Sequence, residues 1–253
     1  ASSPDGIRWS WRGDALGAAP AWASRSDRFW APDVVYDSIR RRYVLYYAAQ
    51  RDGGDRGMGI GVAVSVSPLG PFRSTGKPLV SAPGFEAIDP MAFRDPVSGK
   101  KYLYWGSDSR PLRVRELSDD WLSFEEGSSA SVVLQPDVDS GYDRLIEGPW
   151  VTFYGGYYYL FYSGDNCCGA GAHYAVMVAR SAHPQGPFTR YSTAHGTRTS
   201  VILHASPGWV APGHNSVVTD EEGRYWMYYH AIPADAFHRK QYGRVMLRRQ
   251  IRF

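Results

Sequence analysis

Two carboxylates and one imidazole occupy corresponding places in segments of the chain that resemble one another. Asp89 and Glu147 each stand at the start of an apolar, strand-like stretch and close to a proline, and His214 stands at the start of a later stretch. Two carboxylates beside an aromatic-lined pocket can cleave a glycosidic bond, because one protonates the leaving oxygen while another activates water or tunes its partner. An inverting pair needs roughly 6.5–9.5 Å between the carboxyl groups, which strand starts across a narrow pore provide.

The segments that carry these residues repeat one pattern, a hairpin of alternating apolar and aromatic residues. Pro32, Pro90 and Pro149 mark its first strand and are 58 and 59 residues apart, and Asn215 follows after 66 residues. A period near 60 residues with about four strands per unit is typical of a β-propeller with long loops. A jelly roll or a sandwich has no such period, so the sequence predicts an all-β propeller.

Extended towards the N-terminus, the same period predicts one more unit, which would open before residue 1. Residues 1–28 resemble the outer strand of that unit, whose inner hairpin is absent from the chain. We therefore expect a single five-bladed domain over residues 1–253, with an incomplete first blade and further blades that start near 30, 88, 147 and 213. Helical periodicity is nearly absent, and only Leu117–Phe124 favours a short turn of helix.

The first strand of every propeller blade lines the central axis, so the starts of these strands meet at one end of the fold. The side chains at the matching positions are Ala31, Asp89, Glu147 and His214, with Glu147 one residue earlier than strict register. Taken singly, Asp-Pro usually marks a corner before a strand, and a histidine can be satisfied by core carbonyls. The shared register favours a catalytic site made by the carboxylates together.

The composition argues against several classes of function. The 28 basic residues nearly balance the 25 acidic ones, and the densest basic group, in 239–252, alternates with apolar residues as the outer face of a strand does. We therefore expect no nucleic-acid binding. No run of about 18 apolar residues is present, so we expect no membrane span, and no signal peptide is visible in the given chain. Aromatic residues form 15% of the chain, which suits strands and also a surface on which sugar rings stack.

The two cysteines, Cys167 and Cys168, are neighbours. This spacing excludes a disulfide framework and a two-site zinc pattern. We expect buried thiols or a local bridge within a loop, in preference to a redox or metal-binding role.

Several motifs, taken as a set, resemble glycoside hydrolase family 43, and most closely its arabinan-degrading enzymes. They are Phe29–Val34, Ala87–Pro90, Ile146–Pro149, Tyr157–Ser163 with the following Cys167-Cys168, Val178–Ser181 and Pro212–His214. The likeness runs from about residue 3 to the C-terminus. It implies a five-bladed propeller that hydrolyses α-L-arabinofuranosyl linkages of plant arabinan or arabinoxylan with inversion, using three carboxylates.

The resemblance also implies roles for single residues. Glu147, in Glu-Gly-Pro, corresponds to the general acid, and Asp89, in Ile-Asp-Pro, to the carboxylate that modulates the acid and orients the substrate. His214 corresponds to an axial histidine near a bound calcium or similar ion. No organic cofactor is expected.

Three further residues are candidates for substrate binding. Trp30 resembles a tryptophan that lines the sugar-binding cleft of the family, although a core tryptophan between blades is an equal alternative. Trp105 and Ser107 end a strand at a place where the family often has Gly-Ser near the substrate.

The general base of the family is an aspartate before proline on the first strand of blade 1, which falls in the hairpin that this chain lacks. Asp5 and Asp14 lie after that strand, and Asp33 matches a structural position, so no residue receives the role. We therefore expect impaired activity from the chain as given. The alternatives are a β-xylosidase of the same family and a non-catalytic carbohydrate-binding propeller. The expected partner is an oligo- or polysaccharide, and the expected state is a secreted monomer.

Overall fold

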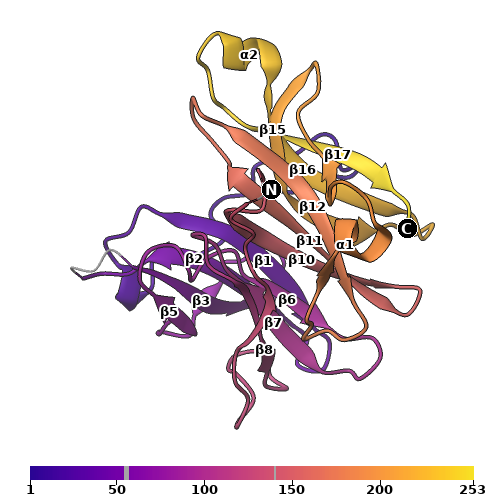
Figure 1. The fold of residues 1–253 in the computed structure, drawn as a ribbon. Helices are drawn as coiled ribbons and strands as arrows, with labels where there is room; N and C mark the ends of the chain where they lie inside the picture. The colour runs from indigo at the N-terminus through magenta and orange to yellow at the C-terminus, as the bar shows by residue number, and fades with distance from the viewer. Residues whose placement is uncertain (54–56, 140) are drawn as a thin grey trace.

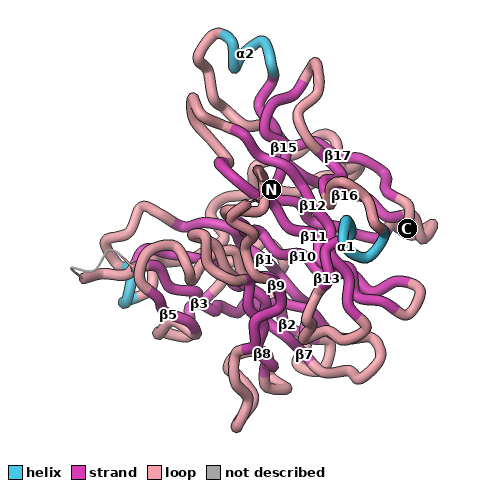
Figure 2. The backbone as a smooth tube through the Cα atoms, viewed as in Figure 1, coloured by secondary structure: helices cyan, strands magenta, loops and turns pink. Residues whose placement is uncertain are grey.

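The computed structural model describes residues 1–53, 57–139 and 141–253, and these residues form mainly antiparallel β-sheet (Figure 1; Figure 2). Among the described residues, four sheets follow one another along the chain, and each begins with an inner hairpin. The propeller prediction is confirmed to the extent of these four blades. The N-terminal sheet lies at the lower left of Figure 1 and the C-terminal one at the upper right.

Each sheet is built from consecutive strands. The first contains β1 (Phe29–Asp37), β2 (Arg42–Gln50), β3 (Met58–Ser65), β4 (Arg73–Ser74) and β5 (Val80–Ala82), and the second β6 (Met91–Arg94), β7 (Lys101–Trp105), β8 (Leu112–Leu117) and β9 (Ser131–Leu134). The third contains β10 (Ile146–Tyr154), β11 (Tyr157–Asn166), β12 (His173–Ser181), β13 (Thr189–Arg190) and β14 (Val201–Leu203), and the fourth β15 (Trp209–Thr219), β16 (Tyr225–Pro233) and β17 (Val245–Ile251). Short helices are the 3-10 turn η1 (Ala21–Ala23), α1 (Tyr191–His195) and α2 (Ala234–His238).

Turn chemistry sets the register of the inner hairpins. β10 and β11 pair up to Tyr154 opposite Tyr157, and the two residues between them are Gly155 and Gly156, with φ of 56° and 85°. Only glycine adopts these values without steric cost, so the Gly-Gly pair fixes a tight turn. The short helix considered for Leu117–Phe124 is not formed, because these two end residues pair as an antiparallel bridge around a turn.

The core lies between neighbouring sheets rather than inside any one of them. Large side chains of the second and third sheets, such as Tyr104 and Leu160, pack in one cluster, and Ile60 and Leu103 join the first sheet to the second. A further cluster joins the third sheet to the fourth. Because each sheet buries its faces against its neighbours, the inner strands are held in fixed positions at the axis.

Residues 1–28 do not form a sheet of their own in the described part of the chain. The Asp5 carbonyl accepts a hydrogen bond from Arg248 Nη1 at 2.9 Å, and Trp9 meets Tyr228 edge-on, so the first residues contact the fourth sheet. Further on, Leu16 forms an isolated bridge with Phe72, the residue before β4. The predicted fifth, incomplete blade is therefore not confirmed, since this segment makes isolated bridges and side-chain contacts in place of a continuous strand ladder.

Among the described residues, no helix has the length and apolar character needed to cross a membrane.

Candidate active site

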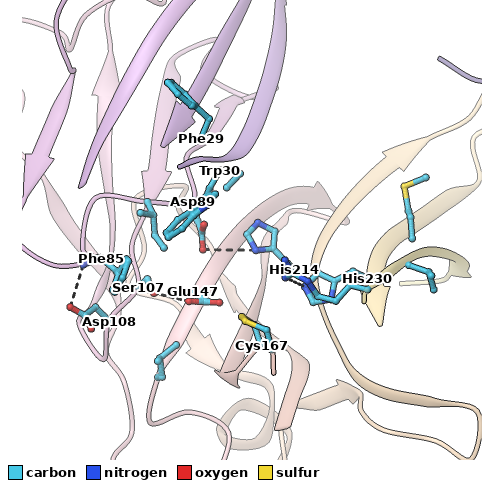
Figure 3. Close-up of a pocket in the computed structure, with 17 residues that line it drawn as sticks. Phe29, Trp30, Phe85, Asp89, Ser107, Asp108, Glu147, Cys167, His214 and His230 are labelled. Carbon is cyan, nitrogen blue, oxygen red and sulfur yellow. Dashed lines mark hydrogen bonds and ion pairs between the residues drawn. A yellow bond between two sulfur atoms is a disulfide. The ribbon is translucent and has the colours of Figure 1, made fainter. Parts of the chain in front are cut away.

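A cavity of about 890 Å³ opens near the start of the inner strands and is bordered by all four sheets or the loops that lead into them (Figure 3). Trp30 comes from β1, Asp89 from the loop before β6, Glu147 from β10 and His214 from β15. The side chains of Asp89, Glu147 and His214 converge on the same space in Figure 3. The repeat register therefore brings together residues that are about 60 positions apart in sequence.

An irregular backbone at or just before the start of each inner strand aims these side chains. The pairing register shifts after Trp30 in β1, after Glu147 in β10 and on both sides of Gly213 in β15. At the corresponding positions the backbone has a left-handed φ, which is 57° at Asp89, 58° at Gly148 and 50° at His214. Bulges of this kind re-aim side chains next to functional sites, and a positive φ at a non-glycine residue is strained. Glu147 precedes the left-handed position, which explains its offset from strict register.

Asp89 is buried, with 5% of its surface exposed, and its Oδ2 accepts a hydrogen bond from the Gly148 N–H at 3.0 Å. Burial raises the pKa of Asp89 to about 7; His214 opposes this rise, while Glu147 adds to it. The nearby negative charge of Glu147 and the loss of water both disfavour the ionised form. Asp89 thus links two inner strands and also presents a poorly solvated carboxyl group to the pocket.

Glu147 receives a hydrogen bond on each carboxylate oxygen. Ser107 Oγ donates to Oε2 at 2.7 Å, and Tyr174 Oη donates to Oε1 at 2.6 Å. Burial and the adjacent Glu147 raise the pKa of Tyr174 well above its usual value, so its hydroxyl stays protonated. Two donors from different sheets hold the carboxylate in one orientation.

His214 lies against both carboxylates. Its Nδ1 is 4.0 Å from Asp89 Oδ2, and its backbone N–H donates to Ser163 Oγ at 2.8 Å. Ligand atoms of Asp89, Glu147 and His214 lie within 4.8 Å of one another, and two carboxylates with an imidazole are a donor set that suits a divalent cation. Within the described part of the chain, this is the group of side chains that could hold a metal ion.

Aromatic and apolar groups complete the pocket. Trp30 is 38% exposed and stacks on Phe85, with ring centroids 5.8 Å apart. Cys167 and Cys168 form a disulfide with each other, so of the two expected alternatives the structure contains the local bridge. Both cysteines also border the pocket.

The remaining side of the pocket holds a histidine and an arginine. Arg244 Nη1 is 3.2 Å from His230 Nε2. Burial, assisted by Arg244, lowers the pKa of His230 to about 3. The imidazole is therefore neutral and accepts the arginine N–H at Nε2.

The sequence candidates differ in where the structure places them. Trp30 borders the pocket, as does Ser107, whose hydroxyl is bonded to Glu147. Trp105, expected to bind substrate, is instead a core residue. Its side chain is 5% exposed, packs with Phe124 and belongs to the cluster between the first and second sheets.

Sequence reasoning missed Tyr174, His230 and Arg244. Tyr174 belongs to the third strand of its sheet, whereas the repeat register singles out first strands only. Its ring reaches the axis because Gly213 opposite it has no side chain; a Cβ there would lie 2.0 Å from the ring. The Pro-Gly-His sequence contained the only hint of this close approach.

The candidates considered for a general base lie elsewhere. Asp5 binds Arg8 on the surface, and Asp14 borders a neighbouring cavity behind Trp30. Asp33 borders a smaller cavity that shares Asp89 with the pocket, and its Oδ2 accepts the Ala92 N–H at 2.7 Å. Asp108 is the further carboxylate among the described lining residues, and its Oδ2 accepts the Phe85 N–H at 3.3 Å.

The chain is similar to several known proteins. A family model described as glycosyl hydrolases family 43 matches residues 1–253. The chain is 30% identical over 257 aligned residues to the extracellular exo-α-(1→5)-L-arabinofuranosidase ArbA of Cellvibrio japonicus, which covers 92% of this chain and 72% of the relative. It is 32% identical over 248 residues to xylosidase/arabinosidase 43A of Humicola insolens, covering 83% and 67%.

Among solved structures, the α-L-arabinanase of Cellvibrio cellulosa superposes with a TM-score of 0.82 at 25% identity. The match covers 99% of this chain and 84% of that chain. The chain spans between 64% and 72% of the length of the curated relatives that it matches.

Proposed function

Since this chain belongs to family 43 of the glycosyl hydrolases, we propose that it hydrolyses α-L-arabinofuranosyl linkages in plant cell-wall arabinan or arabinoxylan. The observation that carries the proposal is that Asp89 and Glu147 face one pocket beside the stacked rings of Trp30 and Phe85. Arabinose as the sugar is supported by the two Cellvibrio relatives, one named an arabinofuranosidase and the other an arabinanase.

In the proposed mechanism, Glu147 protonates the oxygen of the leaving group. Its two hydroxyl donors fix the direction of the carboxyl group before the substrate arrives. Asp89 modulates this acid, because two carboxyl groups this close to each other disfavour ionisation of both at once. The aromatic pair Trp30 and Phe85 supplies an apolar face for a sugar ring. Inversion requires that water attack from the face of the sugar opposite Glu147.

The proposed mechanism assigns no side chain of the described pocket as the general base that would activate this water. Asp108 borders the pocket, but its Oδ2 accepts the Phe85 N–H at 3.3 Å, and Asp33 accepts the Ala92 N–H at 2.7 Å, so the proposal assigns both carboxylates to holding the backbone. The proposal therefore includes slow turnover by this chain. General base catalysis contributes about 10²- to 10⁴-fold, which sets the expected size of the deficit.

The proposal extends to one divalent cation, such as calcium, bound at the His214 imidazole. The proposal is supported by the donor atoms around it, since Asp89 Oδ2 lies 4.0 Å from His214 Nδ1 and the donor atoms of Asp89, Glu147 and His214 lie within 4.8 Å of one another. When bound, the cation would hold the imidazole in place and offset the negative charge of the pocket. Glu147 has both oxygens engaged by hydroxyl donors and serves as the acid.

We also propose that the protein acts outside the cell as a monomer on oligo- or polysaccharide. Its relative ArbA is described as extracellular, which supports this location.

The test is hydrolysis of paired aryl glycosides, α-L-arabinofuranoside and β-D-xylopyranoside, by the full chain and by its Glu147→Gln variant. We expect release from the arabinofuranoside only, with a loss of about 10²-fold or more in the variant. Sodium azide, a nucleophile that needs no base, should raise turnover of the dinitrophenyl arabinofuranoside by the slow wild-type chain. Faster release from the xyloside would favour the xylosidase alternative.

Calorimetric titration with arabino-oligosaccharides separates the enzyme from a binding module. Binding without turnover in the presence and absence of azide would replace the proposal with a non-catalytic carbohydrate-binding function. Turnover that Glu147→Gln leaves unchanged would remove Glu147 from the acid role.

A further inference from the structure

The disulfide between Cys167 and Cys168 borders the pocket, yet the proposed mechanism gives it no part. Cys168 is exposed and Cys167 is half-buried, so the two sulfur atoms are not covered by other side chains. In Figure 3 the Cys167 sulfur points to the side of the pocket where Glu147 lies. The disulfide is therefore within reach of a sugar bound at the candidate acid.

The pairing of β10 with β11 places the disulfide near Glu147. Glu147 lies opposite Ser163, and just beyond this pair the Asp165 N–H donates to the Leu145 carbonyl at 2.9 Å. β11 ends at Asn166, and the two cysteines follow at once. The disulfide and the carboxyl group thus lie at the same end of one hairpin, whose backbone is held by its strand pairing.

A bridge between neighbouring residues contributes little to the stability of a fold. A disulfide stabilises mainly by restricting the unfolded chain, and this effect grows with the length of the loop that it closes. Here the sequence separation is 1. Hydrogen bonds also shape the connection between β11 and β12, since Asn166 Nδ2 donates to the Gly171 carbonyl at 2.9 Å and the Ala172 N–H to the Gly169 carbonyl at 3.2 Å. Stability therefore does not account for a disulfide at this place.

The connection that carries the disulfide presents no hydrogen-bonding side chain to the pocket. Residues 167–172 are Cys-Cys-Gly-Ala-Gly-Ala, so the two sulfurs are the largest side-chain atoms that this connection offers. A disulfide has no N–H or O–H to donate, and its sulfur atoms are polarisable and accept hydrogen bonds only weakly. Such a surface favours C–H groups, because a hydroxyl group turned to it would lose its hydrogen bond to water.

The hydrogen-bonding side chains around the same space come from other segments, among them Asp89, Ser107, Glu147, His214, His230 and Arg244. The second apolar surface of the pocket, Trp30 stacked on Phe85, also comes from elsewhere in the fold. A sugar ring presents hydroxyl groups and C–H groups in different directions. Bound beside Glu147, a ring can direct hydroxyl groups at the polar side chains and C–H groups at the sulfurs.

We propose that the Cys167–Cys168 disulfide is a substrate contact, on which the C–H side of the sugar ring beside Glu147 packs. This inference rests on the proposed glycosidase function and adds a recognition element to it. The disulfide takes no part in the chemistry and stays oxidised throughout. Its contribution is to binding, next to that of Trp30 and Phe85.

Nuclear magnetic resonance of the native chain tests the contact without any turnover. The chain has 2 cysteines, so cysteine labelled with carbon-13 at Cβ gives signals from this disulfide alone. The probe is an α-1,5-arabinotriose with sulfur in place of the linking oxygens, which resists hydrolysis. We expect nuclear Overhauser effects between the cysteine Cβ protons and the ring C–H protons of the bound trisaccharide. A trisaccharide that binds without these effects would overturn the proposal.

Calorimetric titration of the double variant Cys167→Ala/Cys168→Ala with the same trisaccharide supplies the second test. Loss of both sulfurs should raise Kd about tenfold, as expected for an apolar group removed from a binding pocket. Urea unfolding of the variant should match that of wild type. Cys167→Ser/Cys168→Ser, which places hydroxyl groups where the sulfurs were, should weaken binding at least as much. A Kd that rises only together with a loss of unfolding free energy would show a merely structural role.

The matched control is Ala170→Ser in the same connection. Ala170 is exposed, lies outside the described lining of the pocket and leaves the disulfide intact when substituted. We expect an unchanged Kd, and a rise equal to that of the double variants would contradict a specific contact of the sulfurs. If the trisaccharide does not bind the wild-type chain at all, the proposed function fails and this inference with it. If it binds but does not touch the disulfide, this inference alone is refuted.

Discussion

Asp33 and Asp89 make the same contact one sheet apart. Each carboxylate accepts a hydrogen bond from a backbone N–H of the next inner strand, Asp33 from Ala92 at 2.7 Å and Asp89 from Gly148 at 3.0 Å, and each contact spans 59 residues. Both aspartates border a small cavity of about 210 Å³, and Asp89 alone of the two also borders the large pocket. A structural link between neighbouring sheets is thus repeated, and one copy also lies at the candidate site.

Substitution of the two aspartates should separate these roles. Asn retains an oxygen that accepts the backbone N–H, so both Asp33→Asn and Asp89→Asn should fold. We expect Asp89→Asn to lower kcat for an aryl arabinofuranoside by about 10²-fold, because the acid loses a neighbouring carboxylate. Asp33→Asn should stay within about twofold of wild type. Equal losses in the two variants would assign Asp89 to the structural link alone.

Asp33 should make stability depend on pH. Burial raises its pKa to about 6, against the opposing hydrogen bonds from Ala92 and Val34, whereas the group in the unfolded chain titrates near 3.8. Between these values the folded state binds more protons, so its free energy of unfolding falls as pH rises from about 4 to 6, by up to about 3 kcal/mol. Urea unfolding across this range should show that slope in wild type and lose it in Asp33→Asn. A slope that persists in the variant would contradict the assignment.

The two tryptophans considered for substrate binding should behave differently on truncation to alanine. Trp30→Ala removes an exposed ring stacked on Phe85 and should weaken arabino-oligosaccharide binding about tenfold with little effect on folding. Trp105→Ala opens the core between two sheets and should destabilise the fold by about 3–5 kcal/mol. Calorimetric titration and urea unfolding measure the two effects. Weaker binding by a fully folded Trp105→Ala would restore it as a contact residue.

Calcium should stabilise the protein through His214. An ion that binds only the folded state raises the free energy of unfolding as its concentration exceeds Kd. Thermal unfolding after chelation and after addition of calcium should show a rise in Tm for wild type and none for His214→Ala. His173→Ala is a suitable control, because His173 pairs with Asp165 at the ends of β12 and β11, next to the loop that carries the cysteines. An equal rise in His214→Ala would place any calcium elsewhere.

The repeat pattern predicted the inner strands well because its signal is local. Alternating apolar residues, a Gly-Gly turn and a regular spacing identify hairpins whose starts meet at the axis, and this was enough to bring Asp89, Glu147 and His214 together. The direction of a side chain at a strand end, in contrast, is not determined by the local sequence. Trp105 and Ser107 are two residues apart, yet one lies in the core and the other reaches Glu147.

The contact of Tyr174 with Glu147 could not be predicted from the sequence for a different reason. This contact depends on the absence of a side chain at Gly213 in another sheet, a long-range coincidence that no spacing rule describes. The fifth blade was predicted from the period alone. Residues 1–28 instead use side chains such as Trp9 and Trp22 to pack on existing sheets.

The contact between Asp5 and Arg248 joins residues that are 243 positions apart. During synthesis at about 5–20 residues per second, Asp5 is made roughly 10 to 50 s before its partner. The three inner sheets that precede β15 can pack while the chain is still growing, but the N-terminal segment cannot dock on β16 and β17 until those strands have been released. Association of the first and last parts of the chain is therefore a late folding step, and Tyr228 and Arg248 lack the contacts of this segment until then.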